Sequence, residues 1–271
     1  MTDTTQLLEI AAHVAEEAAE LARMRRIEGV SVAASKSTAV DIVTHADREV
    51  EALIRGRLAE ARPDDGFFGE ESGAEAGSSG LTWVVDPIDG TVNYLYGIPQ
   101  YAVSIAVVEG EADPLSWRAL AGVVVNPELG ERFAATVGGG STLNGRGIRV
   151  TTDVSPDRAL IGTGFGYRPE VRVRQAETIV PLISQVRDIR RMGAASLDLC
   201  GVACGRIDGY FERGLQPWDH AAGVLIAAEA GARVSGWRGA PPSAEFTLAA
   251  DAPLAEFLEK SLLNAAADWA D

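Results

Sequence analysis

Cysteine and histidine are scarce in this chain of 271 residues, which holds two cysteines and three histidines. The cysteines, Cys200 and Cys204, lie four residues apart in an apolar, helix-like stretch. A zinc site would need further ligands, and this helical spacing suits two buried thiols better than a disulfide. We therefore expect reduced, structural thiols, and the few histidines leave little material for histidine-based hydrolysis.

Long apolar runs and excess positive charge are lacking as well. No apolar run approaches the roughly 18 residues that a membrane-spanning helix needs. The first five residues contain no basic segment, so no secretory signal is expected. The formal net charge of −15 argues against nucleic-acid binding through a basic surface. We expect a cytoplasmic enzyme with no membrane or nucleic-acid partner; most of the excess acid serves solubility, and some is available for metal ions.

Composition is ordinary for a globular protein, with 46% hydrophobic and 23% charged residues. No internal repeat or long linker divides the chain, so residues 1–271 are expected to form a single domain with a sizeable core. Helical patterns alternate with groups of strands, which predicts a layered α/β (α+β) fold.

Hydrophobic periodicity predicts where the elements lie. Helices are expected over residues 4–27, 46–61, 170–183, 193–203, 217 onward and 254–266. Strands are expected over residues 67–71, 83–86, 102–108, 120–125, 131–135, 160–166, 208–212 and 246–250. Residues 29–38 and 73–80 are expected to be loops, and Thr4 or Thr5 to cap the first helix.

A turn that carries two acids follows the apolar residues Trp83–Val85. The β-branched valines favour a short buried strand that stops at Asp86. Pro87 has a restricted φ and no N–H, so neither a strand nor a helix continues simply through it. Asp86 and Asp89 therefore lie on one turn, close enough to share a hard cation such as Mg²⁺.

Three more acids have two interpretations each on local evidence. Glu70 follows a short strand, where an acid is equally well explained as a solvated surface group. Asp47 and Asp219 lie in the first turns of helices, where a carboxylate caps free N–H groups and is favoured by the helix dipole. Taken together, however, Glu70, Asp86 and Asp89 match the oxygen-rich ligand sets of phosphoryl-transfer metal sites.

Three motifs resemble those of the inositol monophosphatase family. Residues 83–91, Trp-Val-Val-Asp-Pro-Ile-Asp-Gly-Thr, resemble its principal signature. Residues 69–72 resemble its upstream acidic motif, and residues 217–223 its C-terminal Trp-Asp signature. Order and spacing agree, and the likeness, which extends to the bacterial inositol-1-monophosphatase subgroup, runs from the first helix to the last strand.

The resemblance implies a layered αβαβα sandwich and a role for each matching residue. Metal ligands would be Glu70, Asp86, Asp89, Asp219 and the carbonyl of Ile88. Residues that position or deprotonate the attacking water would be Glu70, Thr91 and Asp47. Phosphate would be bound by Gly90, Thr91, Gly193 and Ala194. Other substrate contacts would come from Asp89, Ala195, Glu212 and Asp219, with Glu212 reading an alcohol hydroxyl.

The implied reaction is Mg²⁺-dependent hydrolysis of inositol 1-phosphate to myo-inositol and phosphate by metal-activated water. Histidinol phosphate, fructose 1,6-bisphosphate and 3′-phosphoadenosine 5′-phosphate are alternative substrates within the family. A regulatory protein that binds the transcription machinery is an alternative of another class. The resemblance also implies a homodimer, inhibition by Li⁺ and a mobile loop carrying Lys36 near the site.

One segment departs from the family pattern. The family commonly has Gly-Ser-Ala-Ala or Gly-Thr-Ala-Ala where this chain has Gly193, Ala194, Ala195 and Ser196. The hydroxyl group has moved two positions along the chain. Backbone N–H groups are unaffected by that change, so it bears on substrate detail rather than on the reaction.

Overall fold

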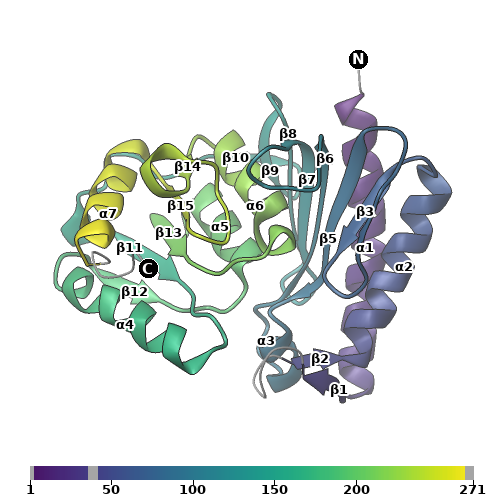
Figure 1. The fold of residues 1–271 in the computed structure, drawn as a ribbon, viewed down its shortest axis with the longest axis horizontal. Coiled ribbons are helices and arrows are strands. Elements are labelled where there is room, and N and C mark those ends of the chain that lie inside the picture. The colour runs from purple at the N-terminus through teal and green to yellow at the C-terminus, as the bar shows by residue number, and fades with distance from the viewer. Residues whose placement is uncertain (1–2, 36–41, 266–271) are drawn as a thin grey trace.

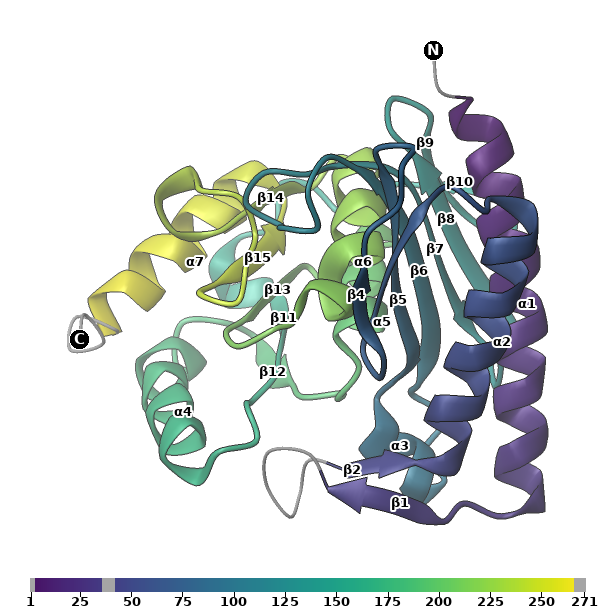
Figure 2. The ribbon, with the colours of Figure 1, turned by 45° about the vertical axis from the view of Figure 1, so that its right-hand side comes forward.

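The computed structural model describes residues 3–35 and 42–265. Its helices and sheets stack in five layers, alternately helical and stranded, along the long axis of the molecule (Figure 1). The view turned by 45° shows the same order of layers (Figure 2). The predicted layered αβαβα fold is therefore confirmed.

The first layer consists of α1 (Thr4–Glu28) and α2 (His45–Ala61), which pack on one face of the larger sheet. Both helices lie within one residue of their predicted bounds. The predicted cap was wrong: the side chain of Asp3, rather than that of Thr4 or Thr5, accepts the free N–H groups at the start of α1. A carboxylate at this position satisfies donors that the helix itself cannot pair.

The larger sheet has eight strands. In spatial order they are β10 (Arg146–Ile148), β9 (Gly140–Leu143), β8 (Glu131–Thr136), β7 (Arg118–Asn126), β6 (Ala102–Glu109), β5 (Leu81–Asp89), β3 (Gly66–Gly69) and β4 (Gly73–Glu75). The prediction that β5 stops at Asp86 was wrong, because Asp89 pairs with Ala102 after a register shift. A bulge accommodates Pro87, which donates no ladder hydrogen bond. Asp86 and Asp89 thus flank a bulge inside a strand.

The middle layer consists of α5 (Ala195–Ala203) and α6 (Pro217–Glu229), which lie between the two sheets (Figure 1). Their apolar residues belong to one buried core cluster with residues of both sheets. Where α6 meets the larger sheet, Gly122 of β7 faces Ala222 of α6, and a Cβ on Gly122 would lie 3.1 Å from the Cα of Ala222. This close approach holds α6, and with it Asp219, against the larger sheet. Cys200 lies in α5 and Cys204 directly follows its last residue; both are free, as predicted.

The second sheet and the outer helices complete the stack. The five strands, in spatial order, are β12 (Asp188–Arg190), β11 (Leu160–Thr163), β13 (Gly209–Glu212), β15 (Thr247–Ala250) and β14 (Arg233–Ser235). The helices α4 (Pro169–Ile183) and α7 (Ala252–Ala265) cover the face away from α5 and α6 (Figure 1). No helix in the described ranges is both long and apolar enough to span a membrane.

Several short elements lie where loops were expected. Strand β1 (Val32–Ser35) pairs with β2 (Ile42–Thr44), and β4 lies within the predicted connector 73–80. The remaining short elements are α3 (Thr91–Tyr96), η1 (Pro156–Arg158) and η2 (Trp237–Gly239). Backbone pairing with a neighbouring strand, which leaves little trace in hydrophobic periodicity, explains why β1 and β4 were missed. Lys36 lies outside the described residues.

Candidate functional site

Glu70 and Asp86 lie side by side because β3 and β5 are parallel. Gly69 pairs with Val85, and the N–H of Glu70 donates to the carbonyl of Val85 at 3.2 Å. Parallel strands that are in register end at the same edge of a sheet. The two acids, 16 positions apart by their numbers, are therefore brought together by strand pairing.

The bulge in β5 turns the backbone between Asp86 and Asp89. The N–H of Ile88 donates to Oδ1 of Asp86 at 3.0 Å, which closes a tight local turn. The carbonyl of Ile88 lies 3.1 Å from Oγ1 of Thr91. Asp86 and Asp89 are both buried. Two carboxylates and a carbonyl oxygen thus lie on one buried turn.

Asp219 reaches the same region from the start of α6. Its Oδ2 accepts the N–H of Gln216 at 2.6 Å, and Pro217 occupies the first turn, where a missing N–H is harmless. The ring of Trp218 meets Phe68 of β3 edge to face at 5.4 Å, which ties the start of α6 to the strand before Glu70. Glu70, Asp89 and Asp219 all line one cavity of about 490 Å³.

The electrostatics of the cluster are unfavourable as they stand. Burial raises the pKa of Asp86 well above its ordinary value, and repulsion from Glu70, Asp89, Asp219 and Asp47 raises it further. Burial also raises the pKa of Asp219, again with help from neighbouring acids. Burial raises the pKa of Asp89 to about 6, although hydrogen bonds from Ser196 and Ala195 oppose the shift. Such a cluster is stabilised by a bound cation.

The carboxylate and carbonyl oxygens of the cluster are ligands of the kind that a hard divalent cation prefers. Within residues 3–35 and 42–265, no three acidic, histidine or cysteine side chains are grouped closely enough to hold a metal ion. Asp89 and Asp219 instead accept hydrogen bonds from the protein. These bonds engage only Oδ2 of each carboxylate, so small side-chain rotations that turn the other oxygens toward one another let the carboxylates converge. The buried oxygen-rich set suits Mg²⁺.

The two segments predicted to bind phosphate are in contact. A Cβ on Gly90 would lie 3.2 Å from the carbonyl oxygen of Gly193 and 3.2 Å from the Cβ of Ala194. Asn93 joins them further, since its side-chain amide donates to the carbonyls of Gln100 and Met192. Gly90 and Gly193 both have φ near +90°, a conformation that glycine adopts without a steric penalty.

Asp47 and Thr91 are paired as the resemblance implied. Oγ1 of Thr91 lies 3.2 Å from Oδ1 of Asp47, and the other oxygen of Asp47 accepts the N–H and the hydroxyl of Thr44. Burial raises the pKa of Asp47, while the hydrogen bonds from Thr44 and Thr91 oppose the shift. A buried carboxylate with an elevated pKa beside a hydroxyl is suited to accepting a proton.

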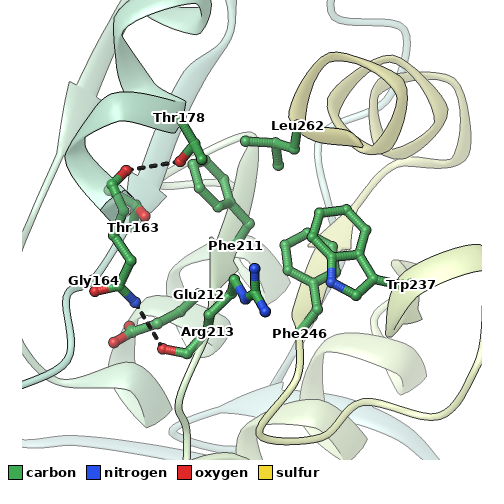
Figure 3. Close-up of a pocket in the computed structure, with 10 residues that line it drawn as sticks. Thr163, Gly164, Thr178, Phe211, Glu212, Arg213, Trp237, Phe246 and Leu262 are labelled. Atoms are coloured by element: carbon green, nitrogen blue, oxygen red, sulfur yellow. Dashed lines mark hydrogen bonds between the residues drawn. The ribbon is translucent and has the colours of Figure 1, made fainter. Parts of the chain in front are cut away.

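Ala195 and Glu212 also line the 490 Å³ cavity. Glu212 ends strand β13 and also borders a second cavity of about 20 Å³, shown in Figure 3. Burial raises the pKa of Glu212 to about 7. The predicted substrate contacts therefore lie on the same cavity as the acids.

Two residues near the site were missed from the sequence. Ser196 contacts Asp89 with both its N–H and its hydroxyl, although 107 positions separate the two residues. Arg191 lines the cavity and interacts electrostatically with Asp89 and Glu212, lowering the pKa of each. The displaced hydroxyl was visible in the sequence, but nothing in it indicated Asp89 as its partner.

Known proteins with similar sequences and structures share this arrangement of elements. A family model described as the inositol monophosphatase family matches residues 3–268. The inositol-1-monophosphatase of Mycobacterium bovis is 45% identical over 250 residues, covering 86% of this chain and 84% of that protein. The Nus factor SuhB of Xylella fastidiosa is 43% identical over 202 residues, covering 74% of this chain and 71% of that protein. The crystal structure of the extragenic suppressor protein SuhB from Bartonella henselae has a TM-score of 0.87 at 34% identity, covering 95% of this chain and 98% of its own.

Proposed function

Because the chain belongs to the inositol monophosphatase family, we propose that it hydrolyses inositol 1-phosphate, or a similar polyol monophosphate, in a Mg²⁺-dependent reaction. Family membership identifies it as a phosphatase of phosphate monoesters. The choice of polyol and of Mg²⁺ is our proposal. It is carried by one observation: the cavity that is lined by Glu70, Asp89 and Asp219 is also lined by Glu212.

Glu70, Asp86, Asp89, Asp219 and the carbonyl of Ile88 would hold the divalent cations. Mg²⁺ bound there supplies positive charge that neutralises the phosphate and increases the acidity of a water molecule. The phosphate oxygens would be bound by backbone N–H groups of Gly90 and Thr91 from one side. Gly193 and Ala194, which pack against Gly90, would bind it from the other side.

The proton of the attacking water would pass to the pair formed by Thr91 and Asp47. The hydroxyl of Thr91 lies within hydrogen-bond distance of Asp47, so a proton moved to that hydroxyl can continue to the carboxylate. Glu70, which follows strand β3, would orient the water. The attack is in line with the leaving alcohol and forms no phosphoenzyme, since no nucleophilic side chain is required.

A panel of phosphate esters assayed with Mg²⁺ and with EDTA tests this proposal. We expect Mg²⁺-dependent release of phosphate that is fastest with inositol 1-phosphate. The three other esters in the panel are histidinol phosphate, fructose 1,6-bisphosphate and 3′-phosphoadenosine 5′-phosphate. Preference for one of the other three would replace the proposed substrate. Absence of turnover with every ester in the presence of Mg²⁺ would overturn the enzymatic proposal.

A second candidate function is regulation of transcription. It is favoured by the 43% identity to a protein named Nus factor SuhB. Acids occupy every predicted metal position here, which supports catalysis instead. A cytoplasmic location, a homodimer, inhibition by Li⁺ and a single domain over residues 1–271 remain predictions. The last is supported by a site whose residues come from both sheets.

A further inference from the structure

Glu212 separates two cavities. It lines the 490 Å³ cavity together with Glu70, Asp89 and Asp219, and it also lines the smaller cavity of about 20 Å³. Figure 3 shows its carboxylate beside Gly164, with Phe211 and Arg213 as its neighbours along the chain. The orientation of the Glu212 carboxylate therefore decides which of its two oxygens faces a substrate in the larger cavity.

Tyr210 holds one oxygen of that carboxylate. Its hydroxyl donates to Oε2 of Glu212 at 2.5 Å, and the Tyr210 side chain is fully buried. Oε1 accepts no hydrogen bond from the described residues. One oxygen is thus committed to the protein, and the other is available for a single donor from a ligand.

Gly164 provides the space in which the carboxylate lies. A Cβ at this position would overlap both oxygens and the Cδ of Glu212. Those atoms are the far end of a flexible side chain, so a methyl group would displace the carboxylate rather than the backbone. The absence of a side chain at residue 164 is therefore a condition for the observed position of Glu212.

The Glu212 carboxylate lies near other charged side chains. Asp198 is buried and its Oδ1 has no hydrogen-bond partner in the described part of the protein. Asp198 and Asp89 both interact unfavourably with Glu212, whereas Arg191 attracts it. A carboxylate in such an environment keeps one conformation only when a donor and a close-fitting wall fix it.

We propose that Tyr210 and Gly164 are positioning residues that fix the Glu212 carboxylate with Oε1 toward the substrate, and so set the preference for a hydroxyl-bearing alcohol. This inference rests on the proposed phosphatase activity. It assigns the selection of polyol esters over esters without hydroxyl groups to a tyrosine that itself does not line the substrate cavity.

The test compares Tyr210→Phe with the unmodified protein on two esters, inositol 1-phosphate and phenyl phosphate, which has no alcohol hydroxyl. We expect KM for inositol 1-phosphate to rise about tenfold while kcat is nearly unchanged, because an interaction with the bound alcohol is weakened. Both constants for phenyl phosphate should stay unchanged. In a Glu212→Gln background, Tyr210→Phe should have no further effect, since the two residues act as one unit.

Tyr101→Phe is the matched control. Tyr101 is also fully buried and also donates to a carboxylate, Oε1 of Glu128 at 2.9 Å, but Glu128, unlike Glu212, does not line the cavity. The Tyr101→Phe variant should leave KM for both esters unchanged. Gly164→Ala, a second variant, should reproduce the selective rise in KM without removing any hydrogen bond donor.

Equal changes on both esters in Tyr210→Phe and Gly164→Ala, or no change on either, would overturn the positioning role. So would an undiminished effect of Tyr210→Phe in the Glu212→Gln background. Failure of the proposed function would look different, because the unmodified protein would then release no phosphate from either ester, and the positioning role would fall with it.

Discussion

Ser196 donates two hydrogen bonds to the same oxygen of Asp89, from its N–H at 2.7 Å and from its hydroxyl at 2.5 Å. Both residues are buried, so the two bonds are shielded from competing water. With Oδ2 held in this way, Oδ1 is the oxygen left for a cation. Residues that hydrogen-bond to a metal-ligating side chain commonly affect metal affinity as well as the orientation of that side chain.

Replacing Ser196 by Ala should weaken Mg²⁺ binding about tenfold while the backbone bond preserves the fold. The physical reason is that Asp89 loses one of the donors that stabilise its charged form and hold its orientation. Isothermal titration with Mg²⁺ measures the affinity directly, without turnover. Unchanged affinity would show that the hydroxyl is incidental; Ser184→Ala, on an exposed surface position, is the control.

Asp89→Asn should reduce turnover by at least about a thousandfold and leave the fold intact. The amide removes a ligand charge, and it also relieves repulsion among buried carboxylates. Mg²⁺ should raise the melting temperature of the unmodified protein and have little effect on the variant, because a ligand stabilises only the state that binds it. Near-normal turnover in Asp89→Asn would refute the metal assignment.

The metal-free protein should lose stability as pH rises from about 4 to 7. The pKa of Asp89 is about 6 in the folded protein, above its ordinary value of 3.8, so the folded state binds more protons in this interval. Stability is then highest while the group is protonated and is lost as pH rises through about 6. Melting curves in EDTA should show this slope, and it should be flatter in Asp89→Asn. An equal slope in both proteins would contradict the assignment.

Asp47→Asn should lower kcat by about a hundredfold or more, with unchanged affinity for Mg²⁺. The amide keeps the size of the side chain but cannot take the proton passed through Thr91. Thr91→Ser keeps the hydroxyl and should retain most activity, which makes it the matched variant. A large loss of Mg²⁺ affinity in Asp47→Asn would instead indicate a role in holding the cation.

Much of the fold followed from periodicity. The long helices and the central strands bury regular apolar faces, and these were predicted within a few residues. The short strands β1 and β4 were not, because their backbone pairing with a neighbour leaves no apolar repeat. The continuation of β5 to Asp89 was missed for a related reason: a bulge lets a strand pass a proline, and only the partner strand reveals it.

The sequence by itself determined the chemistry of the site. Acids followed apolar runs at Glu70 and Asp86, a proline marked the turn before Asp89, and the motif order identified the family. Only the tertiary structure decided how these groups meet. Parallel pairing set Glu70 beside Asp86, and the packing of α5 set Ser196 against Asp89. Such contacts join residues that are distant in the chain, so they depend on how the layers pack rather than on any local pattern.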